Sequence, residues 1–235
     1  MKKKLLALAC AIGTSPALAL SINFTGYENN AFFGVEQIEI LNLAAWQYES
    51  RITNDITLDV SLSTVSLPGN TLATGGANWQ WNIGEDITVG NITGGSIEFN
   101  TGNSNFYNYD LYSITVHELG HVLGIVNGFA PWNNLLTDDG AWFTGEYSVS
   151  VYGGLVPVTV DGAHWDNIRW DSEINPSMFP SFRPGEVRTL SALDLAALAD
   201  MGWQVSNIPE PETWAMLLVG LGIVGMAAKR RRWAT

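Results

Sequence analysis

The chain has 235 residues, of which 46% are hydrophobic and 14% charged. This length is enough for one domain with a substantial core. The formal net charge is −12, and most of the basic residues stand at the two ends, in Lys2–Lys4 and Lys229–Arg232. Residues 20–208 hold four basic and 21 acidic residues, a net charge of −17, so phosphate repulsion excludes nucleic acid as a partner.

The N-terminus has the three parts of a secretory signal peptide. Three lysines precede a short apolar run at Leu5–Ile12 and the small-x-small site Ala17-Leu18-Ala19. We therefore expect residues 1–19 to be removed on export. Cys10, the only cysteine, lies in this segment, so the mature domain has no thiol for a disulfide or a zinc ligand. A lipoprotein with a lipidated Cys10 is an alternative that Ala7, three residues earlier, disfavours.

One helix and several strands are predicted in the first half of the domain. Val35–Glu49 has apolar residues near helical spacing and predicts a helix. Ile56–Leu62 alternates apolar and polar residues, which predicts a half-buried strand. Residues 63–95 are rich in Gly, Asn and Thr and predict turns, with short strands at Trp79–Trp81 and Ile87–Val89. No internal repeat is apparent.

A polar loop separates a further predicted strand, Ser96–Asn100, from the helix that carries the strongest motif. Asp110 is a suitable N-cap for a helix over Leu111–Leu123. This helix contains His117-Glu118-Leu119-Gly120-His121, an HExxH motif. Because residues i and i+4 lie on one face of a helix, His117 and His121 can bind one metal ion.

The residue types of this motif indicate zinc-dependent hydrolysis. Glu118 lies about a third of a turn from His117, so it can reach a water on the ion without ligating the ion. Zinc lowers the pKa of such a water towards about 7, and Glu118 can then accept its proton as general base. The hydroxide would attack a carbonyl that the same zinc polarises.

A catalytic zinc usually has three protein ligands and one open position, so a third ligand is needed. We expect His164, the only other histidine of the chain, because imidazole suits zinc. The carboxylates of Asp138, Asp139 and Asp166 are alternatives. Asp138-Asp139-Gly140 also offers oxygen ligands to calcium, but the chain has no twelve-residue EF-hand pattern, so calcium is only weakly signalled.

The later elements complete an α+β pattern. Phe143–Val151 and Val156–Val160 predict a hairpin around Gly153-Gly154. The last helix is expected over Ser191–Gly202, with Asp194 completing a capping box at its start. Strands precede the helices rather than alternating strictly with them, which favours an α+β fold.

The last 32 residues differ in character from the domain. Asn207–Pro211 predicts an extended linker, Trp214–Ala228 is an uncharged run, and Lys229–Arg232 is basic. The run is shorter than the roughly 20 residues of a transmembrane helix. This order resembles the PEP-CTERM sorting signal of Gram-negative bacteria.

The PEP-CTERM resemblance runs from Pro209 to the end of the chain. It implies a temporary membrane anchor that an exosortase recognises and cuts. The protein would then be exported across the inner membrane and reside in the cell envelope or outside the cell. A plain membrane anchor is the alternative.

The segment His117–Gly124, HELGHVLG, resembles the metzincin metalloproteases, whose pattern is HExxHxxGxxH. Gly124 matches the family glycine that ends the helix, but Asn127 stands where the third histidine would be. In the leishmanolysin-like group, the third histidine lies far downstream, in a His-Trp pair shortly before a methionine turn. His164-Trp165, followed by Met178, is similar to that arrangement.

The metzincin resemblance implies an N-terminal subdomain with a twisted mixed sheet and two helices. A smaller C-terminal subdomain would supply His164, the methionine turn at Met178 and a closing helix. A peptide substrate would lie along an edge strand, for which we expect Gly95–Asn100. The pocket for the side chain after the scissile bond would be walled by residues 179–183, which follow the methionine and include Phe179, Pro180 and Arg183.

Three parts are thus predicted: a signal peptide at 1–19, a metzincin-like zinc protease domain at 20–205 and a sorting segment at 206–235. The expected activity is that of an exported endopeptidase with one Zn²⁺ ion and a protein or peptide substrate. An exosortase-type enzyme is the expected processing partner, and membrane contact is expected only through the C-terminal segment.

One alternative to an endopeptidase is a zinc hydrolase of a non-peptide substrate, because the zinc chemistry is common to both classes of enzyme. The other is an inactive envelope-anchored binding or structural protein, against which the intact Glu118 argues.

Overall fold

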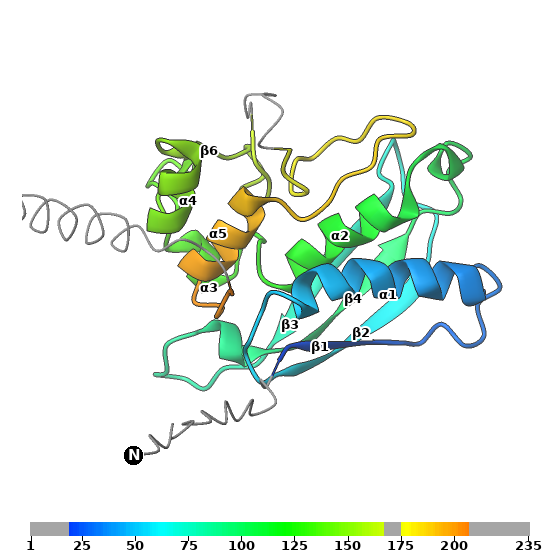
Figure 1. Ribbon diagram of the computed structural model, residues 1–235, viewed down its shortest axis with the longest axis horizontal. Helices are drawn as coiled ribbons and strands as arrows, with labels where there is room; N and C mark the ends of the chain where they lie inside the picture. Colours follow the sequence, from blue (N-terminus) through cyan, green and yellow to red (C-terminus); the bar gives the residue numbers. More distant parts are fainter. Residues whose placement is uncertain (1–18, 167–174, 207–235) are drawn as a thin grey trace, which may run out of the picture.

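The computed structural model describes residues 19–166 and 175–206. The expected signal peptide, apart from Ala19, and the apolar C-terminal run lie outside the described residues. Within the described ranges, no helix has the length and apolar character needed to cross a membrane. These ranges form a mixed sheet covered on one face by two helices, with a smaller, mainly helical part beside them (Figure 1). The fold is therefore α+β, as predicted.

The main sheet has four strands in the spatial order β1-β2-β4-β3. Strands β1, β2 and β4 are mutually parallel, and β3 pairs antiparallel with β4. Side chains of β2 alternate between buried and exposed, as the sequence predicted, with the buried ones facing the helices. The strand bounds are β1 Ser21–Thr25, β2 Thr57–Thr64, β3 Ala73–Trp79 and β4 Ile92–Phe99.

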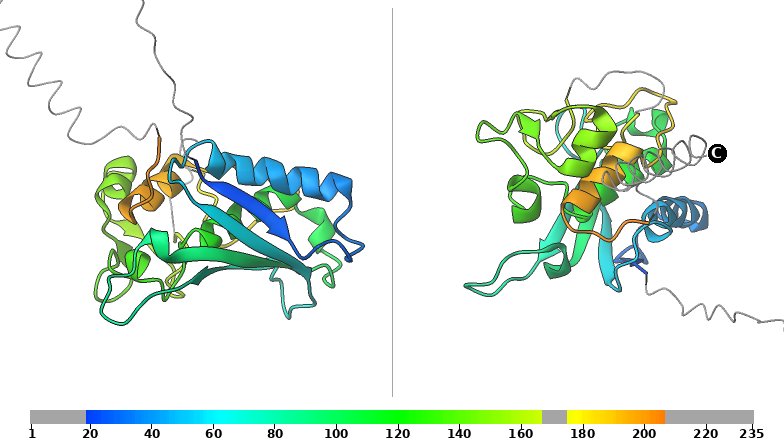
Figure 2. Two further views of the ribbon diagram at one scale, coloured as in Figure 1. Left: turned by 90° about the horizontal axis from the view of Figure 1, so that it is seen from below. Right: turned by 60° about the vertical axis from the view of Figure 1, so that its left-hand side comes forward.

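Helices α1 (Val35–Glu49) and α2 (Leu111–Val122) lie on the same face of the sheet (Figures 1 and 2). Helix α1 occupies the predicted span. The hydroxyl of Tyr48 on α1 donates to the Val116 carbonyl of α2 at 2.6 Å. Asp110 caps α2 as predicted, since its side chain accepts from the Ser113 backbone N–H. Helix α2 therefore contacts both its neighbour α1 and the strands β3 and β4.

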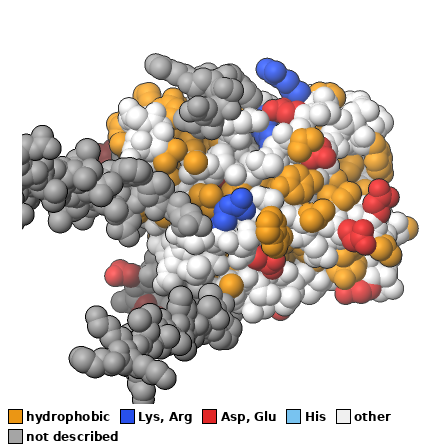
Figure 3. Space-filling model, in the orientation of Figure 1, with side chains coloured by type: hydrophobic (Ala, Val, Ile, Leu, Met, Phe, Trp, Pro, Cys, Tyr) orange, Lys and Arg blue, Asp and Glu red, His pale blue; other side chains and the backbone are white. Residues whose placement is uncertain are grey.

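The outer face of α1 is exposed and mixed in character. Val35, Leu43 and Trp46 are exposed there. The face of the molecule on which α1 lies shows hydrophobic side chains among acidic ones, with few basic groups (Figure 3). This distribution agrees with the acidic composition of the domain.

The smaller part is built on an aromatic core. The Trp132 and Phe143 rings stack with centroids 4.5 Å apart, and Trp165 packs against both. Ser191 caps the last helix in a capping box with Asp194, as predicted. The helices of this part are α3 (Ala130–Asn133), α4 (Glu146–Tyr152) and α5 (Ala192–Asp200), and its strands are β5 (Trp142–Phe143) and β6 (Val156–Pro157). Two 3₁₀ turns, Val89–Asn91 and Phe106–Asn108, lie before and after β4.

The predicted hairpin around Gly153-Gly154 is wrong. Most of the expected first strand is the helix α4, and only the two-residue strands β5 and β6 pair. Asp200 of α5 stabilises this helix, because its carboxylate accepts from the backbone N–H groups of Tyr147 and Ser148 at 2.9 Å. Gly153 ends the helix in the left-handed region, with φ of 82°. A contact from a distant helix thus outweighs the local strand pattern.

The predictions for the segment before β4 also need correction. The strand expected at Trp79–Trp81 begins earlier and forms β3, while the expected strand at Ile87–Val89 leads into a 3₁₀ turn. Gly95–Asn100 is not an edge strand, since β4 pairs on both sides, with β2 and with β3. The glycine-rich β3 lacks an apolar alternation, so pairing with β4 and packing on α2 decide its conformation.

Candidate metal centre

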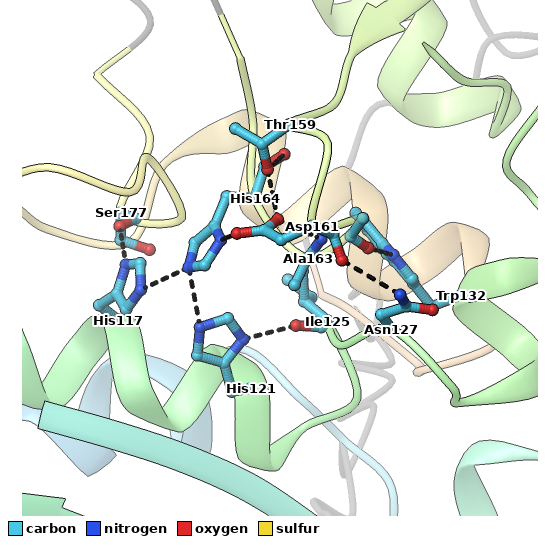
Figure 4. A network of polar contacts seen from close by, with 11 residues as sticks. His117, His121, Ile125, Asn127, Trp132, Thr159, Asp161, Ala163, His164 and Ser177 are labelled. Carbon is cyan, nitrogen blue, oxygen red and sulfur yellow. Dashed lines mark hydrogen bonds and ion pairs between the residues drawn. The ribbon is translucent and has the colours of Figure 1, made fainter. Parts of the chain in front are cut away.

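Three histidines from two distant segments meet above α2. His117 and His121 lie one helical turn apart on α2, and both side chains are buried. His164 lies in the loop after β6 and points down at them (Figure 4). Among the described residues, these three form the cluster whose ligand atoms suit a metal ion, and all lie within 4.8 Å of one another.

The three imidazoles converge through the same ring nitrogen. His164 Nε2 lies 3.2 Å from His117 Nε2 and 3.2 Å from His121 Nε2. Two nitrogens bound tetrahedrally to zinc at about 2.0–2.1 Å lie about 3.3 Å apart. The spacing therefore fits one tetrahedral ion.

Each of the other ring nitrogens, Nδ1, faces an oxygen that accepts a hydrogen bond. His117 Nδ1 donates to the Ser177 carbonyl at 2.7 Å, and His121 Nδ1 donates to the Ile125 carbonyl at 2.6 Å. His164 Nδ1 donates to an Asp161 carboxylate oxygen at 2.9 Å. Because carbonyl and carboxylate oxygens only accept, all three rings carry their proton on Nδ1, which leaves Nε2 as the ligand atom.

Burial keeps the two helix histidines neutral. Desolvation, followed by the neighbouring imidazoles, lowers the pKa of His117 well below its usual value and that of His121 to about 4. In neutral rings with Nδ1 protonated, the Nε2 lone pairs face one another at 3.2 Å without a shared proton. Such an arrangement is unfavourable unless a cation lies between the nitrogens, so the cluster could hold a metal.

The carboxylates considered as alternative ligands do not join the cluster. Asp138 and Asp139 line a separate hollow, together with Asn127 and Asn133. Asp166 is likewise absent from the group of converging ligand atoms. Within the described part of the chain, the imidazole of His164 is therefore the third arm of the site.

Glu118 follows His117 on α2 and packs against Gly75 of β3. Its side chain is buried, and burial raises the pKa of Glu118 to about 8, although a hydrogen bond from the Gly75 backbone N–H acts in the opposite direction. A cation held by the three imidazoles would favour the ionised carboxylate and lower this pKa. No sequence pattern pointed to Gly75, which contacts Glu118 only through the packing of β3 on α2.

Gly124 ends α2 in a Schellman motif. Its φ is +102°, its N–H donates to the His121 carbonyl, and the Ile125 N–H donates to the Gly120 carbonyl. The turn so formed directs the Ile125 carbonyl back onto His121. The glycine thus contributes to holding one histidine of the cluster.

Met178 is buried against α2. A Cβ on residue 120 would collide with the Met178 sulfur, so the glycine of the HELGH motif leaves room for that side chain. The Met178 carbonyl accepts from the Trp165 backbone N–H at 3.1 Å. The turn at Met178 therefore contacts both the helix and the residue after His164.

Phe182, which belongs to the predicted wall segment 179–183, lies beside the cluster. Its ring is 5.5 Å from the His117 ring, centroid to centroid. Of the predicted wall residues, Phe179 is half-buried, whereas Pro180 and Arg183 are exposed. The buried Arg188 side chain lies over the Phe179 and Phe182 rings and donates to the Phe179 and Ser181 carbonyls. A buried cation thus organises this loop.

Residues 207–232 match the PEP-CTERM protein-sorting motif, at the position that the sequence indicated. The match indicates export and sorting to the cell envelope of a Gram-negative bacterium, and it implies recognition by an exosortase-type enzyme. The matched segment lies outside the described residues. No curated protein matches the chain.

Proposed function

We propose that the protein is an exported zinc-dependent endopeptidase of the metzincin type, similar to the leishmanolysin-like group. The observation that carries the proposal is the convergence of three unprotonated Nε2 atoms, from His117, His121 and His164. Glu118, the residue after His117 on α2, adds a buried carboxylate. The PEP-CTERM match supports export and processing at the envelope.

His117, His121 and His164 would hold the zinc ion. A zinc ion bound there would supply an acidified water and a Lewis acid for a carbonyl group. Three hydrogen bonds, to the carbonyls of Ser177 and Ile125 and to the Asp161 carboxylate, keep the imidazoles in the ligating tautomer.

Glu118 is the general base in this proposal. Its carboxylate accepts a proton from the attacking water and later donates it to the leaving amine. The Gly75 backbone N–H holds the carboxylate on the β3 side of α2, so it acts beside the histidines rather than as a fourth ligand. Burial raises the pKa of Glu118, which makes it a stronger base than an exposed glutamate once ionised.

The substrate would be an extended peptide that pairs with β3 rather than with the segment expected from the sequence. In the main sheet, β3 stands at one edge, and its Gly75 touches Glu118. Strand addition at this edge uses main-chain hydrogen bonds and so brings a peptide carbonyl to the site with little dependence on side chains. The Phe182 ring beside His117 would contact the side chain next to the scissile bond.

The test combines zinc content with cleavage of casein for the purified protein and three variants. The wild type should bind one zinc per chain and cleave casein. Glu118→Ala should keep its zinc and lose on the order of 100-fold or more of kcat, because the general base is removed. His164→Ala should lose both zinc and activity. Glu39→Ala, which changes an exposed glutamate of α1, should match the wild type.

The outcomes separate this proposal from its alternatives. A wild type that binds zinc but cleaves only small esters or amides would indicate a non-peptide hydrolase. A wild type that binds zinc and cleaves nothing would indicate a binding or structural protein. Full activity of Glu118→Ala, or full zinc content of His164→Ala, would refute the assigned roles.

A further inference from the structure

Two turns in the smaller part share the pattern Thr-x-Asp-Gly-Ala. Thr137–Ala141 reads Thr-Asp-Asp-Gly-Ala, and Thr159–Ala163 reads Thr-Val-Asp-Gly-Ala. Trp142 follows the first turn and His164 follows the second.

Both turns are built by the same hydrogen bonds. In each, the threonine hydroxyl and the alanine N–H donate to Oδ1 of the aspartate, at 2.6 and 3.1 Å for Asp139 and at 2.5 and 2.9 Å for Asp161. The glycine N–H donates to the threonine carbonyl at 2.7 and 2.8 Å, and the two glycines have φ of 69° and 71°. One carboxylate oxygen is thus sufficient to form this turn.

The second carboxylate oxygen distinguishes the two turns. Oδ2 of Asp161 accepts from His164 Nδ1 at 2.9 Å. At the equivalent position the first turn carries Trp142, whose indole nitrogen is not a metal ligand. The contact made by Asp161 Oδ2 is therefore not required to form the turn, and it is directed at one of the three converging histidines.

Two further hydrogen bonds join the second turn to the segment that follows α2. Asn127 Nδ2 donates to the Asp161 carbonyl at 3.1 Å, and Trp132 Nε1 donates to the Gly162 carbonyl at 2.7 Å (Figure 4). Both donors belong to the segment that follows α2. Asn127, which stands where the metzincin pattern has a histidine, thus anchors the loop that supplies the third imidazole. The carboxylate of Asp161 consequently has a fixed position relative to His117 and His121.

We infer that Asp161 is a positioning residue for the metal centre, an inference that rests on the proposed function. Its Oδ1 folds the turn, and its Oδ2 holds the proton of His164 on Nδ1, so that Nε2 is the free nitrogen and faces the other two histidines. Outer carboxylates of this kind orient a histidine ligand and increase its basicity. Asp139 folds an equivalent turn and has no such role.

Asp161→Asn separates the two roles of the carboxylate, because an asparagine has one side-chain oxygen where the aspartate uses two. If its oxygen accepts from Thr159 and Ala163, its NH₂ group faces His164 and favours the tautomer with the proton on Nε2, which cannot bind metal. If its oxygen accepts from His164, the turn loses its acceptor. In Asp139→Asn the single oxygen can serve the turn, because no histidine competes for it. The two substitutions are therefore chemically matched.

The experiment measures zinc affinity of the full chain by competition with a chromophoric chelator at neutral pH. Asp161→Asn should bind zinc 10- to 100-fold more weakly than the wild type, as found when outer partners of ligating histidines are removed. Asp139→Asn should stay within about twofold of the wild type. In the zinc-free protein, long-range ¹H–¹⁵N spectra, in which the chain contributes only three histidines, should show His164 protonated on Nδ1 in the wild type and on Nε2 in Asp161→Asn.

Each failure has a distinct meaning. A wild type that binds no zinc would overturn the metal centre and this role together. A wild type that binds zinc, with equal affinity in Asp161→Asn, would overturn the role of Asp161 alone. Equal weakening in Asp161→Asn and Asp139→Asn would show that the fold of the turns, rather than the contact to His164, matters, and would also overturn the inference.

Discussion

Gly75 on β3 sets how closely the edge strand approaches Glu118. A Cβ at this position would lie 2.6 Å from the Glu118 carbonyl oxygen and 2.9 Å from a carboxylate oxygen. Heavy atoms do not approach a Cβ so closely without a shift of the backbone. The neighbouring Gly76 has space, since a Cβ there would meet nothing within 4 Å. Of these two adjacent glycines, only Gly76 can therefore be replaced by alanine without a shift of the backbone.

If Glu118 is the general base, as proposed, we predict that Gly75→Ala lowers kcat for the proposed peptide cleavage by about tenfold or more, because a displacement of that carboxylate on the order of 1 Å has effects of at least this size. Zinc content should be unchanged, since the three atoms nearest to the new methyl group all belong to Glu118, which is not one of the converging ligands. Gly76→Ala should behave as the wild type. Steady-state kinetics with a fluorogenic peptide, together with zinc analysis, provide the measurement. Normal kcat in Gly75→Ala would argue against a close packing requirement at Glu118.

Asp194 joins three elements of the smaller part. Its buried carboxylate caps α5 by accepting from the Ser191 N–H and hydroxyl. It also accepts from the N–H and hydroxyl of Ser177, from the Met178 N–H and from Trp165 Nε1. The carbonyl of Ser177 in turn accepts from His117. The helix cap is therefore also the support of the methionine turn and of the residue beside His164.

Asp194→Asn should lower the free energy of unfolding by about 3 kcal/mol or more, because several buried donors lose a charged acceptor at once. Asp110→Ala, which removes the cap of α2, should cost only about 1 kcal/mol, since a single N-cap is lost. Urea unfolding of the zinc-free proteins, followed by circular dichroism, compares the two. A cost for Asp194→Asn no larger than that for Asp110→Ala would mean that the contacts to Ser177, Met178 and Trp165 add little.

Over the whole molecule, the candidate metal centre and the sorting motif occupy separate parts of the chain. The residues described around the centre run from Gly75 on β3 to Asp194 on α5. The PEP-CTERM match covers residues 207–232. Metal binding and sorting should therefore respond to different changes.

A chain that ends after Ser206 should lose its association with the membrane fraction and keep the zinc content of the full chain. The physical reason is that the apolar run and the basic cluster lie beyond that point, whereas the histidines and their supports lie before it. Fractionation of a Gram-negative host, followed by zinc analysis of the recovered protein, tests both parts. Glu118→Ala in the full chain is the control and should fractionate as the wild type. Retention of the truncated chain in the membrane fraction, or loss of its zinc, would contradict the prediction.

The sequence by itself determined the features that depend on neighbours along the chain. The spacing of His117 and His121 puts both rings on one face of a helix, and Asp110 and Ser191 each cap a helix through the backbone N–H three residues away. The alternation in β2 and the helical periodicity of Val35–Glu49 are equally local. Short-range geometry of this kind is fixed by backbone dihedral angles, which is why it can be predicted from residue types.

Only the tertiary structure decided which distant groups meet. His164 is separated from His121 and His117 by 43 and 47 residues along the chain. The prediction that His164 is the third ligand rests on its being the only other histidine, which gives neither the 3.2 Å spacing of the nitrogens nor the hydrogen bond to Asp161. The edge position of β3 and the helical state of α4 likewise depend on strand order and on Asp200 from another element. Such outcomes follow from packing between segments far apart in sequence, where local propensity is too weak to choose among the alternatives.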